Sequence, residues 1–542
     1  MKIKEYHNLL YLVFLFLMGI TITACTQNNA PQPGEVNVEY TPKHINLIRP
    51  IVEPEKIYRM SLVRESFEAL PQEMAKMRNL QILKLVRLKI NDWESSFKVI
   101  NSFQNLKEIQ ISGIPISKIP IKPENLPHLK TINLRGSRGY CLKEEIENLS
   151  QFDSLESFII GGLDINSFPE NISLLKNLKF LEFGFHAESF DYANAFDLLT
   201  TLPNLNHIDI AGADLTNSID NLRKLNQLSV LALFNCKVEL DKLFNSIHTW
   251  PKLERLELKN MSLDKLPSSI TQLQSLKSLS LYHNPDLDHA SLFRQLAKLP
   301  HLEELDISET NTYTEAKDSS CQEGHALYIP KEYAGIFYMP KELGDLKKLK
   351  KLHLSNLVSV DFDTLLDRLV HLKQLEYLNL SGIGSIDGQG VYLPASLSKM
   401  ENLKELIIDF SGPHPFDLVE QMPPNLEKLD FSSAHFDEYA PLPEVIFTAS
   451  NLKSLNLNDC KLKEFPKGIL KLKELEHLDL GNNQIRELPE AITQLKNLKY
   501  LNLMGTIIST SQEKRDKIEK MLPNTLVFFG EYRAYDPDWM DK

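Results

Sequence analysis

Leucines recur along this chain in the pattern L-x-x-L-x-L, with mostly polar residues between them. Clear copies are LERLELKNMSLDKLPSSITQLQS from Leu253, LKSLNLNDCKLKEFPKGILKLKE from Leu452 and LEHLDLGNNQIRELPEAITQLKN from Leu475. The last two leucines of each motif are two residues apart, so they point to the same side of a short strand. The pattern therefore predicts a series of short strands that share one apolar side.

Eighteen such units follow one another between residue 57 and about residue 508. They start at Ile57, Leu80, Leu106, Leu129, Leu155, Leu178, Leu205, Leu228, Leu253, Leu276, Leu302, Leu349, Leu375, Leu403, Leu426, Leu452, Leu475 and Leu498. A single unit cannot bury its apolar side alone, so neighbouring units are expected to stack. Stacking predicts one parallel sheet on a concave surface, with the leucines in a continuous core.

Units of two lengths alternate, because the first ten intervals run 23, 26, 23, 26, 23, 27, 23, 25, 23 and 26 residues. Several short units carry a proline nine residues before the next start, such as Pro267 and Pro489. Proline fixes φ and lacks an N–H, which suits a non-helical turn. Long units carry segments such as FDTLLDRLVHLKQ, with helical apolar spacing. We expect a convex side on which extended turns alternate with short helices.

These repeats resemble the leucine-rich repeat, in particular its bacterial L-P-x-x-I subtype. The resemblance covers residues 57–508 and implies an α/β solenoid, a horseshoe with a concave parallel sheet and about 18 repeats. Similar bacterial proteins serve adhesion or contact with a host, which is an implication of the resemblance only.

The two ends of the repeat array need caps, because a solenoid exposes its last apolar layers. Residues 509–542 predict an amphipathic helix with Ile518, Met521 and Leu522 inward, followed by a strand around Leu526 to Phe529. At the other end, residues 40–56 are expected to serve as the cap.

The N-terminal segment, residues 1–24, has a basic start and an apolar stretch from Leu9 to Ile22 that ends in ITAC. It resembles a bacterial lipoprotein signal with its lipobox, which implies cleavage before Cys25 and diacylglyceryl attachment to the Cys25 sulfur. A plain transmembrane anchor is the alternative. Residues 25–56 are then the lipidated cysteine, a proline-containing tether and the possible cap. Thr26, which is not aspartate, favours the outer membrane of the cell envelope, and the side that the protein faces stays open.

Composition and motifs narrow the function. The formal charge of −12 argues against nucleic acid as the main partner. The other cysteines, Cys141, Cys236, Cys321 and Cys460, lie far apart and predict no disulfide framework. The motifs H-E-x-x-H, G-x-S-x-G and G-x-x-x-x-G-K-[ST] are absent. We therefore expect no enzymatic activity, no cofactor and no metal, and we expect the HNPDLDH stretch to be a turn with solvated histidines.

Two sets of residues are candidates for partner binding. The outward position between the core leucines forms an acidic column, which includes Glu182, Asp209, Glu257 and Asp306. It suits a basic protein segment, whereas a solvated acidic face is the alternative. The second set is aromatic: Tyr313, Tyr328, Tyr333, Phe337 and Tyr338 lie in an insertion near residues 312–338 that stretches one interval to 47 residues. Partner contact, packing onto the solenoid and disorder remain open for this insertion.

A second, Gly-rich insertion at residues 385–392 leaves its repeat at a similar position two units later, so the two loops are expected about 10 Å apart. The sequence thus predicts a membrane-anchored binding protein that contacts another protein through its concave face and edge loops. Binding of a glycan or envelope polymer, and a structural envelope protein without a discrete ligand, are the alternatives.

Overall fold

The computed structural model describes most of the chain between residues 36 and 529. The described residues are 36–40, 54, 57–116, 118–137, 139, 141–162, 165–184, 189–310, 337–357, 360–383, 395–408, 421–434, 436 and 442–529.

One parallel sheet of twenty strands runs through the repeats. Its strands are β1 (Val36–Tyr40), β2 (Ile57–Val63), β4 (Ile82–Val86), β6 (Glu108–Ser112), β7 (Thr131–Asn133), β8 (Ser157–Ile159), β9 (Phe180–Gly184), β10 (His207–Ala211), β11 (Val230–Phe234), β12 (Arg255–Lys259), β13 (Ser278–Ser280), β14 (Glu304–Asp306), β15 (Lys351–His353), β16 (Tyr377–Asn379), β17 (Glu405–Ile407), β18 (Lys428–Asp430), β19 (Ser454–Asn456), β20 (His477–Asp479), β21 (Tyr500–Asn502) and β22 (Leu526–Phe528). Each predicted repeat has its strand, from β2 to β21, so the predicted fold class is confirmed.

The remaining two strands extend the sheet at its ends. β1 pairs in parallel with β2, and β22 pairs in parallel with β21. The helix predicted after the last repeat is α9 (Gln512–Met521), which buries Ile518. A separate small sheet joins β3 (Ser66–Phe67) to β5 (Lys89–Ile90) in the first two repeats.

The convex side carries the helices. The long units contain α2 (Trp93–Ile100), α3 (Leu142–Leu149), α4 (Tyr192–Leu199), α6 (Leu240–Ile247), α7 (His289–Leu296) and α8 (Phe362–Leu369), and one short unit contains α5 (Ile219–Leu222). The other segments hold 3-10 helices: η2 (Gln72–Lys76), η3 (Glu170–Leu174), η4 (Ser268–Gln272), η5 (Lys341–Asp345), η6 (Ala395–Lys399), η7 (Glu444–Thr448), η8 (Lys467–Lys471), η9 (Glu490–Gln494) and η10 (Ile508–Thr510).

The turn after Pro120 contains no 3-10 helix, whereas the other predicted extended turns that carry a proline each contain a short one. The proline is the extended residue before it, as Pro267 is before η4, with φ −69° and ψ 154°. Its fixed φ starts the turn, and the following residues close a tight helix because an apolar residue such as Ile270 must reach the core. None of the described helices is long and apolar enough to cross a membrane.

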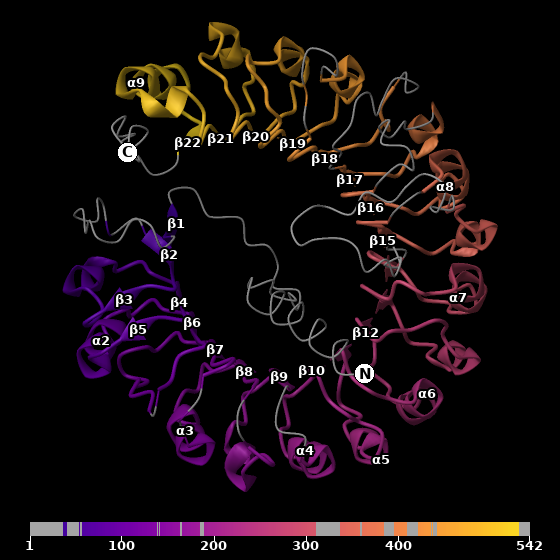
Figure 1. The fold of residues 1–542 in the computed structure, drawn as a ribbon. Helices are drawn as coiled ribbons and strands as arrows, with labels where there is room; N and C mark the ends of the chain where they lie inside the picture. Colours follow the sequence, from indigo (N-terminus) through magenta and orange to yellow (C-terminus); the bar gives the residue numbers. More distant parts are fainter. Residues whose placement is uncertain are drawn as a thin grey trace, which may run out of the picture.

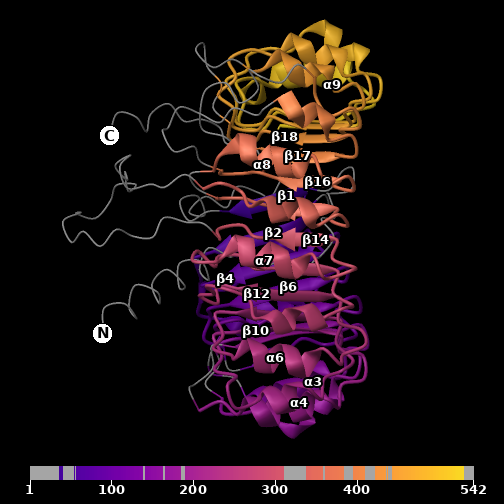
Figure 2. The same cartoon turned by 90° about the vertical axis from the view of Figure 1, so that its right-hand side faces the viewer.

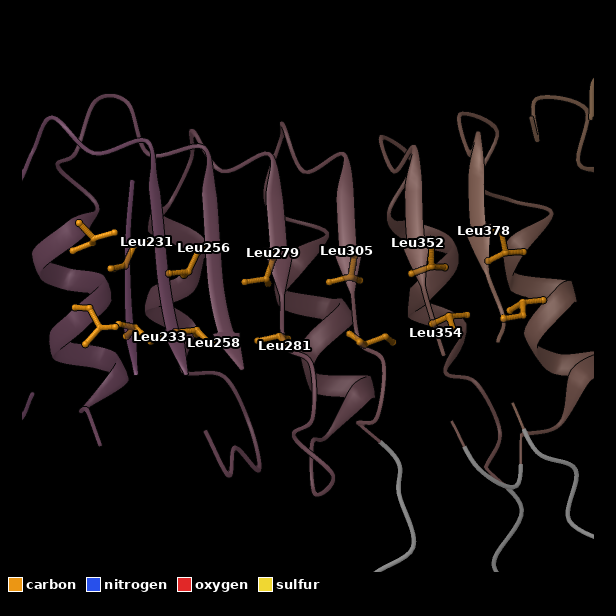
Figure 3. Packing of buried hydrophobic residues seen from close by; sticks show 14 of the residues in the cluster. Leu231, Leu233, Leu256, Leu258, Leu279, Leu281, Leu305, Leu352, Leu354 and Leu378 are labelled. Atoms are coloured by element: carbon orange, nitrogen blue, oxygen red, sulfur yellow. The ribbon is translucent and has the colours of Figure 1, made fainter. Parts of the chain in front are cut away.

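The core lies between the sheet and the convex segments. Figure 3 shows the leucines of neighbouring repeats in two rows that point from the strands toward the helices, for example Leu256 above Leu258 and Leu279 above Leu281. All four side chains are fully buried. The ladder keeps register from strand to strand, so Leu256 stands beside Leu279.

The solenoid curves into a nearly complete ring, with the strands inside and the helices outside (Figure 1). The curvature follows from the different widths of the two sides, because strands pack about 4.8 Å apart and helices about 8–10 Å apart. Seen from the side, the repeats stay within one slab (Figure 2).

Candidate functional site

The concave face is the surface formed by the strand side chains that point away from the core. In β12, Arg255, Glu257 and Lys259 alternate with two buried leucines and therefore point to this face. Because the strands pair in register, equivalent residues of neighbouring repeats stand side by side, as Glu257 and Ser280 do. The concave face is thus a set of columns, and the predicted acidic column is one of them.

Basic side chains neutralise the central part of this acidic column. Glu257 Oε2 lies 2.6 Å from Lys259 Nζ, and Glu257 Oε1 lies 3.6 Å from Arg255 Nη1. Arg255 also reaches across β13, where its Nη2 lies 3.1 Å from Oε2 of Glu304. A hydrogen bond with His353 and the nearby Arg255 charge lower the pKa of Glu304 to about 2. The charges in this part of the face compensate one another.

A second compensated group lies nearer the N-terminal repeats. Arg135 forms an ion pair with Glu182, although β8 lies between their repeats. The Arg135 side chain crosses over Gly161, where a Cβ atom would lie 3.7 Å from Arg135 Cγ, an ordinary contact distance. Burial lowers the pKa of Arg135 to about 10. Asp209 Oδ1 lies 2.7 Å from Nε2 of His207.

Asp306 has a role in the backbone. Its Oδ1 accepts a hydrogen bond of 3.0 Å from the Ser308 N–H, and its Oδ2 accepts one of 2.8 Å from the Ser280 hydroxyl. Bonds of this kind turn the chain at the end of a strand. The same bond to the N–H two residues later is made by Asn133, Asn379, Asp430, Asn456, Asp479 and Asn502.

All four predicted partner-binding acids therefore have partners within the protein. Asp209 and Glu257 are also buried, with 8% and 6% of their surface exposed. Their contact with a partner stays a prediction, but they do not form a free acidic stripe. The sequence carried part of this signal, because Arg255 and Lys259 flank Glu257 at a spacing of two on the same side of the strand.

The insertion ends in the described part of the chain at Phe337. Its backbone forms a parallel bridge to Val360, and its ring centroid lies 4.9 Å from that of His289. Phe337 therefore packs onto the solenoid, whereas the neighbouring Tyr338 is 57% exposed. Met339 is buried and Pro340 precedes η5, so the predicted return to the repeat pattern is confirmed. The predicted site residues Cys25, Tyr313, Tyr328 and Tyr333 and the insertion at 385–392 lie outside the described residues.

His289 contacts both ends of this insertion. Its Nε2 lies 2.8 Å from the hydroxyl of Thr310, just before the insertion, and its ring meets that of Phe337, near the end of the insertion. Burial lowers the pKa of His289 to about 4. The histidine thus lies at the base of the insertion as a neutral side chain.

The two histidines of the HNPDLDH stretch have different partners. His283 Nδ1 lies 2.7 Å from Glu309 Oε2, whereas His289 contacts Thr310. Within the described residues, no group of three or more His, Cys, Asp and Glu side chains is arranged to hold a metal ion. The stretch therefore supplies two separate structural contacts. The expectation of solvated histidines is wrong for His289, which is buried where the insertion leaves the solenoid.

Two buried cysteines bond to the turn backbone, as the repeat position predicts. Cys236 Sγ lies 3.3 Å from the Ile210 carbonyl oxygen, and Cys460 Sγ lies 3.1 Å from that of Phe431. Burial raises the pKa of Cys236 to about 12, so its thiol is protonated at neutral pH. Their structural role is confirmed.

A polar cleft of about 280 Å³ lies beside the N-terminal ends of β11 to β15. Its charged lining is paired: Lys277 Nζ lies 2.7 Å from Glu254 Oε1, and Lys350 Nζ lies 3.0 Å from Glu303 Oε1. These side chains are half exposed, so each ion pair contributes little to the stability of the protein. The cleft offers a polar surface for contact.

One further column was missed by sequence reasoning. The residue seven positions after the repeat start has a positive φ, which favours glycine and asparagine. In the first two repeats this position holds Arg64 and Arg87, with φ of 57° and 53°. The column consists of Arg64, Arg87, Gly113, Gly136, Gly162, Gly212, Asn235, Asn260, His283, Glu309, Asn356, Gly382, Ser433, Asp459, Asn482 and Gly505. The signal in the sequence was the presence of Arg64 and Arg87 at a position that most repeats fill with glycine or asparagine.

Comparison with known families agrees with this geometry. A family model described as "Leucine-rich repeat region" matches residues 230–450, and one described as "Leucine rich repeat" matches residues 450–508. The chain is a leucine-rich-repeat protein. Both matches fall on the strands and convex segments described above.

Several proteins are similar to this leucine-rich-repeat protein. A protein of Arabidopsis thaliana named as a disease resistance protein is 24% identical over 67% of this chain and 33% of its own length. The volume-regulated anion channel subunit LRRC8A of Rattus norvegicus is 27% identical over 44% of this chain and 28% of its own length. The chain thus spans about a third or less of these relatives. A solved LRR protein of Leptospira interrogans is 23% identical, with 81% of this chain and 98% of that one covered and a TM-score of 0.37.

Proposed function

We propose that this leucine-rich-repeat protein is a non-enzymatic binding protein that holds a segment of a partner protein along its concave face. The observation that carries the proposal is the unbroken register of the sheet from β2 to β21. A surface built on paired backbone is rigid before binding, so little ordering entropy opposes association. Repeat proteins commonly bind through such an extended concave surface.

The ring limits the size of the partner. Twenty strands spaced about 4.8 Å apart give an inner perimeter of about 95 Å and a diameter of about 30 Å between backbones. Side chains from opposite walls narrow this to about 20 Å. An α-helix with its side chains is about 10–12 Å wide, whereas a domain of 100 residues is about 34 Å across. This comparison favours a helix or an extended segment over a folded domain.

We further propose that the protein is anchored by a lipid on Cys25 to the outer membrane of a bacterial envelope. The support is the sequence, where a basic start and a short apolar stretch lead into ITAC and then a polar, proline-containing segment. The anchor would hold the ring at a membrane surface, where a tethered binding protein meets its partner at raised effective concentration.

A pull-down with blocked variants tests the binding proposal. Ser278 and Ser454 are half-buried and lie at equivalent positions of β13 and β19 on the concave face. Replacing each by tryptophan is expected to fill the surface and remove the captured partner. The matched control replaces Lys298 and Lys473, which are exposed in outer turns, by tryptophan.

Equal capture by both tryptophan variants would place the contact outside the concave face. Capture of no protein by the wild type, together with retention on a glycan array, would favour the glycan-binding alternative. Circular dichroism of each variant checks that the repeats remain folded.

A further inference from the structure

The first two repeats differ from the rest of the concave face in how their arginines are paired. Arg64 follows β2 and Arg87 follows β4, at equivalent positions of neighbouring repeats. The Arg64 N–H donates to the Val86 carbonyl over 2.9 Å, which sets the two residues side by side. Within the described residues, neither guanidinium has an ion pair or a side-chain hydrogen bond. Two arginines without a carboxylate partner therefore lie side by side, on backbone segments about 5 Å apart.

The two arginines affect each other. Burial and the neighbouring charge of Arg64 lower the pKa of Arg87. The Arg87 side chain leans over the next repeat, where a Cβ atom on Gly113 would come within 3.0 Å of Arg87 Cγ. The absence of a side chain at Gly113 thus leaves space for the Arg87 side chain beside the ends of the strands. Both guanidinium groups stay charged at neutral pH, so they repel each other unless an anion lies between them.

The backbone at these positions favours other residues. Both arginines have a left-handed conformation that side chains with a Cβ adopt at a steric cost. Glycine or asparagine occupies the equivalent position in most described repeats, such as Gly136 and Asn482. A residue type that is locally unfavourable and also repels its neighbour points to a role outside folding.

Two arginines of later repeats on this face show which group is missing. Arg135 pairs with Glu182, and Arg255 pairs with both Glu257 and Glu304. Each of these arginines meets a carboxylate supplied by its own strand or by the repeat two units further along. Arg64 and Arg87 are arginines of the same face for which the described chain supplies no carboxylate.

We propose that Arg64 and Arg87 bind carboxylates of an acidic polypeptide segment from the partner. This inference rests on the proposed function and gives the partner a chemistry. The forked guanidinium group matches a carboxylate through two parallel hydrogen bonds. The chain carries a formal charge of −12, which opposes unspecific association with an acidic peptide. Binding of such a peptide must therefore come from a local positive site.

The test measures binding of a fluorescein-labelled oligoglutamate peptide by anisotropy at low and at physiological salt. The variant R64N/R87N removes both charges and introduces asparagine, which fits the left-handed backbone in other repeats. The control K76Q/R78Q removes two charges from exposed residues of the first repeat, in and just after its convex helix η2. We expect the wild type and K76Q/R78Q to bind within twofold of each other and R64N/R87N to bind about tenfold or more weakly.

R64N/R87N is also expected to unfold at the same temperature as the wild type or at a higher one, so lost binding cannot come from lost folding. Three results would overturn the proposal: no binding of oligoglutamate by the wild type, equal binding by R64N/R87N, or equal loss in K76Q/R78Q. Displacement of the peptide by inorganic phosphate at far lower concentrations than by free glutamate would overturn the choice of a carboxylate. If R64N/R87N still captures the partner found by pull-down, this inference fails while the proposed function stands.

Discussion

Tyr500 in β21 lies close enough to Tyr58 in β2 for the two phenols to interact electrostatically. Burial, with the charges of Asp479 and Tyr58, raises the pKa of Tyr500 to about 12. Tyr500 belongs to the last of the eighteen repeats and Tyr58 to the first. Their interaction therefore indicates that the two ends of the repeat array lie close together. The ring in Figure 1 and this pair describe the same closure.

The closure predicts a short distance between equivalent residues of the first and last repeats. Val63 and Met504 hold the same repeat position, and a spin label at each, in a background without other accessible cysteines, reports their separation. We expect a distance below about 30 Å by pulsed electron paramagnetic resonance. An open half-circle of the same strands would give about 50 Å instead.

The backbone role of Asp306 predicts unequal effects of two substitutions. Asp306→Asn keeps an oxygen that accepts from the Ser308 N–H, so the free energy of unfolding should change little. Asp306→Ala removes the acceptor and is expected to lower this free energy by about 1–2 kcal/mol in urea titrations. If Asp306→Asn destabilises the protein as much as Asp306→Ala, then the carboxylate charge matters more than the turn.

Burial of His289 predicts a pH dependence of stability. Its folded pKa of about 4 lies below the ordinary value of 6.5, so the neutral form is favoured in the folded state. This contribution is fully present above pH 6.5 and is lost as the pH falls from about 6.5 to about 4. The loss is on the order of 3 kcal/mol.

His289→Gln removes the titrating group and keeps a polar side chain near Thr310. Unfolding free energies measured across this pH range are expected to fall less steeply for His289→Gln than for the wild type. The difference between the two curves isolates His289 from carboxylates such as Glu304, which titrate at lower pH. Parallel curves would mean that His289 is already accessible to protons in the folded state.

The anchor proposal predicts where the protein is found after cell fractionation. Cys25→Ala removes the sulfur that would carry the lipid and should move the protein from the membrane fraction to the soluble fraction. Cys141→Ala, which replaces an exposed cysteine of the repeats, serves as the control and should stay with the membrane. A Cys25→Ala protein that remains with the membrane would contradict the lipid anchor.

The repeat architecture was predictable because the same leucine spacing, and with it the same local geometry, recurs in every repeat. The spacing of Leu256 and Leu258 alone fixes a strand, and eighteen copies fix the sheet. The proline positions also located the convex turns, although the 3-10 helix inside most of these turns depends on packing that one position cannot specify.

The chemistry of the concave face was less predictable. A column of acids such as Glu182 and Asp306 is visible in the sequence, but its neutralisation depends on contacts between repeats. Arg135 reaches Glu182 across a whole repeat, a contact that the spacing along the chain does not reveal. The sequence also did not predict ring closure. The curvature accumulates from a small rotation between each pair of successive repeats, and no single residue determines it.

Cross-linking of the captured complex tests whether the concave face holds a segment of a partner protein. Lys84, Lys351 and Lys428 lie on the concave face, at β4, β15 and β18. Mass spectrometry of amine-reactive cross-links is expected to join these lysines to one contiguous stretch of the partner, with acidic residues near the first repeats. Two results would contradict binding of a partner segment along the concave face. One is a set of links that involves only lysines of the convex side, such as Lys76 and Lys298, and the other is a set that reaches several faces of a folded partner domain.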